Sequence, residues 1–313
     1  HCAVVYYRAK LFELKGQLSL AIEEMEGFLE NNPGTTEAYY LYFRLLVEAS
    51  EVLSIAVLDC SEAKIATLCE ITKAASTTYP NELIYGVFSV EVQLLLHQFS
   101  EAYERLQVIS SQSDLLSPEM RTRVEFDLAL CSRYMGEIDL AMATFESLQK
   151  VHPEDSNILI ELTETCMLNE LTSQVEFYAN KVIHLAPDSM KIVNWYIATM
   201  KFLKDKDIAY AKLTELIELY PESLPLRKAF IKMNLEAGHL SHVHKELMGI
   251  VQSDMGLSEE ERTQLVQVAL QSDSLDIATR LINAGGEVFR LPILPLIHYL
   301  ALLMAEKQFG LAL

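Results

Sequence analysis

Three prolines fall at one fixed interval in the middle of the chain. Pro153, Pro187 and Pro221 are each separated from the next by 34 residues, and each closes a segment with the apolar spacing of two short amphipathic helices. A two-helix unit cannot bury its own apolar face, so such units are stable only when neighbouring copies stack on one another. The interval therefore predicts an all-α chain, built as an α-solenoid of tandem helix-turn-helix units.

The unit that ends at Pro153 shows what each position does. Gly136 stands where one helix must stop, because glycine adopts a left-handed C-terminal cap without a Cβ clash. Ala141, Phe145 and Leu148 follow at spacings that place them on one face of the next helix. The small alanine allows two helix backbones to approach closely, the phenylalanine fills the gap to the next unit, and the proline stops the helix.

This pattern resembles the tetratricopeptide repeat (TPR), a helix-turn-helix motif with the same small-residue, glycine, alanine, aromatic and proline spacing. The same steps recur near the start of the chain, at Gly16, Ala21, Met25, Phe28 and Pro33.

The resemblance implies a right-handed superhelical α-solenoid that runs through residues 1–313 as one continuous domain. Because the chain starts at His1 and its last unit stops at Leu313 within the second helix, we expect a fragment of a longer protein. About eight and a half repeats are expected, at residues 2–33, 36–80, 81–116, 118–153, 154–187, 188–221, 222–255 and 258–286, with a partial unit at 292–313.

The second expected repeat is longer than the others. Pro80 follows Pro33 by 47 residues instead of 34. We expect one long helix from Thr36 to Leu58 and a partner helix from Ser61 to Thr77. The additional residues extend either the first helix or the turn from Val57 to Glu62, and such an insertion is expected to project from one end of the solenoid. The sequence leaves open whether this insertion is neutral or makes a contact.

Composition and charge exclude several other classes of protein. With 50% hydrophobic residues but only 11 Gly and 9 Pro, the chain has too few breakers for a strand-rich sandwich or barrel. Its formal net charge of −19 disfavours nucleic acid and anionic membrane surfaces as ligands. The longest apolar run, from Leu291 to Ala305, is shorter than the about 20 residues of a membrane-spanning helix, so no direct membrane insertion is expected.

The sequence contains no catalytic motif, and we expect neither an enzyme nor a cofactor. His239, His242 and His244 would not converge on one metal ion, because the third histidine points to another face of a helix. The cysteines form no C-x-x-C pair and lie in helical stretches, as free core cysteines of a reducing compartment do, so a cytoplasmic location is expected. They are Cys2, Cys60, Cys69, Cys131 and Cys166.

The candidate binding surface lies on the first helix of each unit, which in the resembled family lines a concave groove. Sixteen positions traced along this face hold six basic residues and one acidic residue, although acids outnumber bases in the whole chain. The predicted partner is therefore a protein or peptide with acidic and apolar side chains. Alternatively, these cations only balance acids on neighbouring helices. The predicted groove residues are Arg123, Phe126, Leu130, Arg133, Asn157, Ile160, Lys191, Asn194, Lys201, Lys228 and Lys232.

A second candidate interface is a cluster of aromatic residues from Tyr39 to Phe43, which covers more than one face of its helix. The predicted function is that of a non-catalytic scaffold that binds protein or peptide in the groove and assembles a multiprotein complex. The alternative is a regulatory or targeting module of a larger enzyme, or of an export or secretion apparatus for bacterial polysaccharide or protein, whose active part lies outside this chain.

Overall fold

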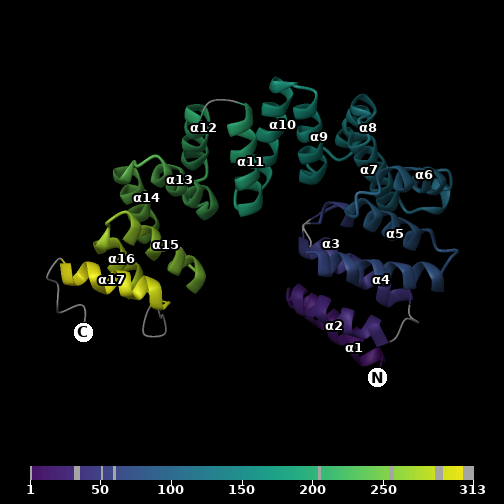
Figure 1. Ribbon diagram of the computed structural model, residues 1–313, viewed down its shortest axis with the longest axis horizontal. Coiled ribbons are helices and arrows are strands. Elements are labelled where there is room, and N and C mark those ends of the chain that lie inside the picture. Colours follow the sequence, from purple (N-terminus) through teal and green to yellow (C-terminus); the bar gives the residue numbers. More distant parts are fainter. Residues whose placement is uncertain are drawn as a thin grey trace. The chain divides into compact units, whose positions relative to one another are not determined.

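The computed structural model describes residues 2–31, 36–50, 52–58, 61–203, 206–253, 257–285 and 292–305. Within these ranges the chain forms seventeen α-helices, two short 3-10 helices and no β-strand. Neighbouring helices in the sequence pack side by side (Figure 1). The prediction of an all-α solenoid of helix pairs is confirmed. None of the described helices combines the length and the apolar character needed to cross a membrane.

The helices fall into two compact units, His1–Lys181 (unit 1) and Val182–Leu313 (unit 2). Unit 1 contains α1 (Cys2–Leu14), α2 (Leu18–Asn31), α3 (Thr36–Ser50), α4 (Glu62–Thr78), α5 (Leu83–Leu95), α6 (Phe99–Ser110), α7 (Pro118–Tyr134), α8 (Ile138–Val151), α9 (Ser156–Leu168) and most of α10 (Thr172–Leu185), together with the 3-10 helices η1 (Ile55–Val57) and η2 (Ser113–Leu115). Unit 2 contains α11 (Met190–Leu203), α12 (Lys206–Leu219), α13 (Leu224–Glu236), α14 (Leu240–Gln252), α15 (Glu259–Gln271), α16 (Leu275–Asn283) and α17 (Ile293–Ala305).

The turn inside a helix pair has one conformation that recurs along the chain. Gly136 takes a φ of +86°, its N–H donates to Arg133 O, and the N–H of Glu137 donates to Ser132 O at 2.8 Å. These two hydrogen bonds cap the last carbonyl groups of a helix, and they form when the residue that follows the helix, here Gly136, is left-handed. Six turns share it, with the left-handed residues Gly16, His97, Gly136, Glu170, Gly238 and Asp273.

The apolar stripes predicted on the second helices lie in the core. Ala141, Phe145 and Leu148 of α8 are buried, as are Ala21 and Met25 of α2. The ring of Phe145 meets that of Phe126 on α7 edge to face, with centroids 5.7 Å apart. The packing reasons inferred from the sequence are confirmed at these positions. Pro33, and the part of the partial last unit that follows Ala305, lie outside the described residues.

The prediction of one long helix from Thr36 to Leu58 is wrong. Helix α3 ends at Ser50, and a short 3-10 helix, η1, follows. The hydroxyl of Ser54 caps η1 by accepting from Ala56 N–H, and the N–H of Ile55 donates to Glu91 Oε2 on α5 at 3.2 Å. Ile55 is fully buried, so these residues pack onto α5 instead of projecting from the unit. We call residues 52–58 the inserted segment.

Candidate functional site

The four groove residues predicted on α7 lie inside unit 1. Arg123, Phe126, Leu130 and Arg133 are 8%, 0%, 2% and 6% exposed. The expectation of an open groove therefore does not match the structure on this helix. The physical reason is packing against the neighbouring helices. Arg123 is bound by Glu91 on α5, Phe126 packs against Phe145 on α8, and Arg133 is bound by two acids on α9.

A buried charge cluster fixes the inserted segment. The guanidinium of Arg123 forms a two-point contact with the carboxylate of Glu91, Nη2 lying 2.6 Å from Oε2, and it stacks 4.9 Å from the ring of Phe88. The same Oε2 accepts the N–H of Ile55. Because Glu91 is fully buried, the arginine provides the charge that makes an ionised carboxylate tolerable there.

Asp127 is the third member of this cluster, and Arg123 and the side chain of Ser54 both favour its ionised form. It is fully buried, and neither of its carboxylate oxygens accepts a hydrogen bond. Burial raises the pKa of Asp127 well above its ordinary value, the charge of Glu91 raises it further, and Arg123 opposes this. We infer that Asp127 is neutral in the folded chain over part of the range above the ordinary carboxyl pKa.

Replacing Asp127 with asparagine should change how the stability of unit 1 depends on pH. The folded pKa is raised, so the stabilising contribution is full below the ordinary pKa of 3.8 and is lost as pH rises through the raised value. Asparagine cannot ionise. The free energy of unfolding of D127N should therefore rise relative to that of the wild type as pH increases through this window, by up to about 1.4 kcal/mol per pH unit. Urea unfolding from pH 4.5 to 8 measures the difference, with E125Q, an exposed change on the same helix, as the control. A difference that does not change with pH would show that Asp127 is ionised when folded.

Arg133 joins two acids on the next first helix, α9. Its Nη1 lies 2.9 Å from Glu164 Oε2, and its Nη2 lies 2.7 Å from Glu161 Oε2. Burial raises the pKa of Glu161 to about 7, against the lowering effect of Arg133, and the charge of Glu164 raises it further. On the same helix, Asn157 and Ile160 are half-buried.

In unit 2 the predicted groove residues are more open. Lys191, Asn194 and Lys201 on α11 are exposed, and so is Lys232 on α13. Lys228 is the exception, because it is half-buried and held by α15.

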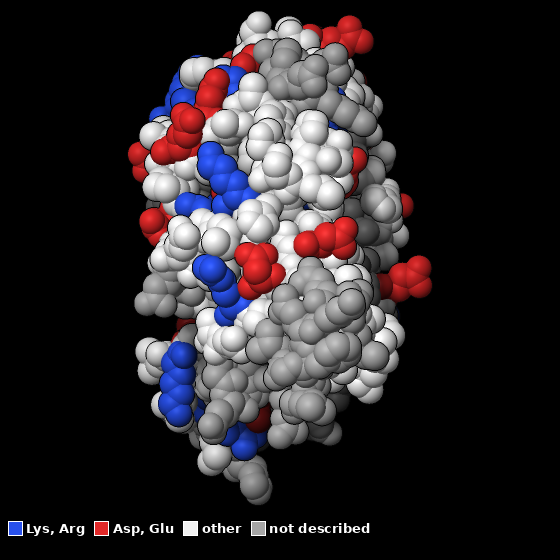
Figure 2. Space-filling view, turned by 90° about the vertical axis from the view of Figure 1, so that its left-hand side faces the viewer, with Lys and Arg blue, Asp and Glu red and all other residues white. Residues whose placement is uncertain are grey.

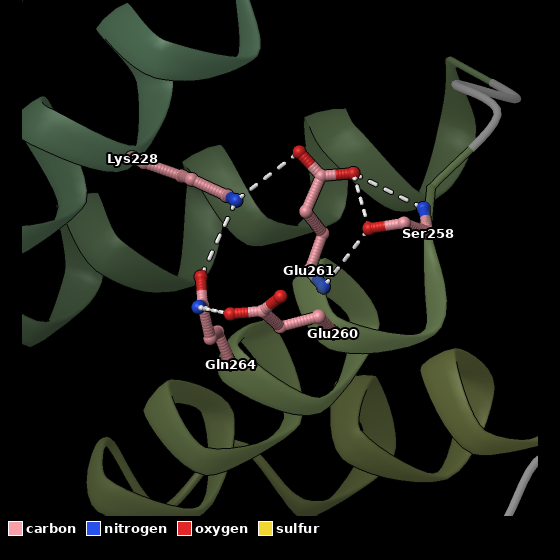
Figure 3. Close-up of polar contacts among 5 residues, drawn as sticks. All are labelled: Lys228, Ser258, Glu260, Glu261 and Gln264. Carbon is pink, nitrogen blue, oxygen red and sulfur yellow. Dashed lines mark hydrogen bonds and ion pairs between the residues drawn. The ribbon is translucent and has the colours of Figure 1, made fainter. Parts of the chain in front are cut away.

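Figure 3 shows how α15 holds Lys228. The ammonium group lies 3.4 Å from Glu261 Oε1 and 3.4 Å from Gln264 Oε1. Glu261 is itself fixed, because its other oxygen accepts the backbone N–H of Ser258 in a capping box at the start of α15. That hydrogen bond is the main reason why the pKa of Glu261 is lowered. At this position the lysine balances an acid on a neighbouring helix.

The face in Figure 2 carries Lys and Arg side chains next to Asp and Glu side chains, without a continuous surface of one sign. Three of the predicted groove cations are paired with acids, since Arg123, Arg133 and Lys228 each contact a carboxylate. The positive character predicted for the whole set of groove residues is therefore retained only where lysines are exposed, on α11 and at Lys232.

The other candidates from the sequence are mostly core residues. Tyr39, Tyr42 and Phe43 are buried, and only Tyr40, 47% exposed, offers surface in the aromatic cluster. The described residues include no group of histidines, cysteines and acids arranged for a metal ion. His242 instead shares hydrogen bonds with Tyr210 and Asn234.

The cysteines that the structure describes are free. Burial raises the pKa of Cys131 to about 12 and that of Cys166 to about 11, so both thiols stay protonated and unreactive at neutral pH. The side chain of Cys2 and the whole of Cys60 lie outside the described part of the chain. The cytoplasmic location stays a prediction.

One pocket, of about 400 Å³, was not predicted from the sequence. It lies in unit 1, where the inserted segment ends against the C-terminal turns of α5 and α7 and the middle of α9. The only signal for it was the extra length of the second repeat, which gave no indication of where the added residues pack.

Comparison with known proteins supports the repeat architecture. Residues 123–155, which include all of α8, match the family model of the tetratricopeptide repeat. No curated protein matches the sequence. Among solved structures, PilW, a widely conserved type IV pilus biogenesis factor, is similar with a TM-score of 0.50 and 16% identity, over 73% of this chain and 97% of that one.

Two further solved structures are similar at lower TM-scores. A thermophilic TPR protein of Thermus thermophilus has a TM-score of 0.47 and 15% identity, over 64% of this chain and 98% of that one. The APC/C hetero-tetramer Cut9-Hcn1 has a TM-score of 0.47 and 13% identity, over 99% of this chain and 55% of that one.

Stacked helix pairs with one recurring turn define an α-helical repeat protein. Residues 123–155 match a tetratricopeptide repeat, and the helix pairs on either side of them have the fold of a tetratricopeptide-repeat solenoid, a class of α-helical repeat protein. Proteins of this class are protein-interaction scaffolds.

Proposed function

We propose that this chain is a non-catalytic scaffold that holds a segment of another protein on its first helices and so assembles a multiprotein complex. The observation that carries the proposal is a solvent-facing stripe on α11. Lys191, Asn194, Ala198 and Lys201 are all exposed and lie on one face of the helix. Most of the residues between them, such as Val193, are buried, so the stripe is held on a rigid support.

The chemistry of this stripe favours a partner with acidic and apolar side chains. The two exposed lysines lie at the ends of the stripe, with Asn194 and Ala198 between them. Phe202, beside the stripe, is 67% exposed. An exposed aromatic ring next to cations suits a ligand that combines an apolar anchor with carboxylates. Because Lys228 is already bound to Glu261, the acidic partner is proposed for α11 and Lys232, and no longer for the full predicted groove.

The double variant K191E/K201E tests this proposal. Exposed charges act mainly on the association rate and are screened by salt, so the variant should bind a partner on the order of tenfold more slowly at low salt, with the gap closing as salt rises. The partner is captured from a lysate of the source organism, identified, purified and measured by surface plasmon resonance.

The matched control is K150E/K245E, which makes the same change of charge at two exposed positions on the second helices α8 and α14. It should bind like the wild type. Equal association rates for all three proteins at low salt would show that the α11 stripe is not the binding surface. A slower association rate in the control alone would place the binding surface on the second helices.

A further inference from the structure

We propose that the pocket in unit 1 takes a lysine or arginine side chain from a protein partner. It has an apolar wall, a half-open aromatic side and two carboxylates at one end, which share a single cation. The inference rests on the proposed function, since it assumes that the chain binds protein segments. It concerns a different unit and the opposite ligand charge, so the two can fail independently.

The apolar wall suits the methylene stem of a basic side chain. It is formed by Ala56, Val57 and Leu58 of the inserted segment and by Leu94 and Leu95 of α5. Phe99 and Tyr134 stack on each other beside it, with ring centroids 4.4 Å apart and 9° between their planes. Lysine and arginine bury their aliphatic stems along such surfaces and keep the charged head in a polar environment.

The polar end of the pocket has more negative than positive groups. Glu161 and Glu164 both line the pocket, and both contact the same buried cation, Arg133. Glu161 Oε2 is buried and lies 2.7 Å from Arg133 Nη2, yet it accepts no hydrogen bond, because the N–H is not directed at it. Glu164 retains 41% of its side-chain surface, so a carboxylate remains open to an incoming donor. A second cation would supply both the missing charge and the missing donor.

The charge of the whole chain favours the same ligand. The formal net charge is −19, and a protein of that charge attracts basic segments over distances of several ångströms at low salt. Locally, Arg133 cannot serve an acidic ligand instead, because both of its terminal nitrogens already contact carboxylates. Charge complementarity therefore selects a basic side chain and disfavours an acidic one.

Binding of a cation should also depend on pH. The charged groups that act on Glu161 are Arg133 on α7 and Glu164 on its own helix, and Tyr134 of α7 and His97, in the turn after α5, line the same pocket. A bound ammonium group favours the ionised form of Glu161, whose pKa is raised to about 7 in the empty pocket. Binding therefore releases a proton, and affinity should rise between pH 6 and 8.

The test uses three capped pentapeptides, Gly-Leu-Xaa-Leu-Gly, in which the central residue is lysine, norleucine or glutamate. Norleucine has the stem without the ammonium group. Binding is followed by methyl NMR of the full chain, with Ile65, Leu94, Leu95 and Leu130 as reporters around the pocket. The lysine peptide should shift these methyl signals and bind at least about tenfold more tightly than the norleucine peptide, and the glutamate peptide should not bind.

Two variants decide whether the carboxylates recognise the cation. E164Q should reduce the preference for lysine over norleucine to less than about threefold, whereas E125Q, an exposed change on α7 away from the pocket, should leave it intact. The pH dependence is measured in the H97N background, so that it reports on Glu161. Equal binding of lysine and norleucine peptides, an unchanged preference in E164Q, or no shift of the reporters would each overturn the proposal. K191E/K201E should bind the lysine peptide normally, which separates this site from α11.

Discussion

Replacing Arg123 with methionine should lower the free energy of unfolding of unit 1 by about 3 to 5 kcal/mol, because one partner of a buried ion pair is removed and the other is left uncompensated. Glu91 has no exposed surface, and Asp127 beside it is also fully buried. The methionine fills much of the same volume, so lost charge accounts for most of the loss. The inserted segment should loosen as well, since Glu91 holds it through Ile55 N–H.

The measurement is urea unfolding with two probes. Far-ultraviolet circular dichroism follows all helices, and the fluorescence of Trp195, the single tryptophan of the chain, follows unit 2. R123M should shift the transition seen by circular dichroism more than the one seen by fluorescence. Equal shifts would show that the two units unfold together.

A second variant separates charge from packing. In E91L/R123M both members of the pair are replaced by apolar side chains, and most of the stability should return, because no unpaired carboxylate of the pair remains. R123K, which keeps the charge but loses the two-point contact, should lie between R123M and the wild type. A loss of less than about 1 kcal/mol in R123M would show that the buried ion pair does not hold unit 1 together.

Phe145→Ala should have an effect of similar size, about 3 to 5 kcal/mol, for a different reason. The ring is fully buried between α8 and α7 and contacts Phe126 edge to face, so truncation leaves a cavity that a closely packed helix pair cannot refill. Urea unfolding of unit 1 again gives the measurement.

The control for this change is Phe177→Ala, a phenylalanine on the second helix α10 of the next pair that is 55% exposed. Its loss should stay within about 0.5 kcal/mol, as for other surface positions. Similar losses at the two positions would show that the stability of unit 1 does not depend on burial in the α7–α8 pair.

The parts of the fold that repeat could be predicted from the sequence. Gly136, Ala141 and Phe145 recur at fixed steps because each helix pair solves the same packing problem, and the structure places them in a turn and in the core. Only half of the recurring turns could be found in this way. His97, Glu170 and Asp273 take the same left-handed conformation as the glycines, and a search for glycines at the turn positions does not find them.

The candidate site was harder to predict because it depends on residues that do not repeat. Arg123 and Phe126 have the spacing of an exposed first-helix face, and nothing local shows that Arg123 is bound by Glu91 on α5 or that Phe126 packs against Phe145. The same holds for Lys228, whose acid partner Glu261 lies 33 residues away. The positions of residues on one face of successive helices do not reveal which cations already form ion pairs with acids on other helices.

Hydrogen–deuterium exchange on the chain with its captured partner tests the central claim most directly, namely that a scaffold of this class binds through the exposed face of its first helices. The claim predicts that the partner slows exchange in α11 and α13, while α12 and α14, the second helices of the same pairs, exchange as in the free chain. Protection confined to α12 and α14, or none in unit 2 at a saturating concentration of partner, would contradict it.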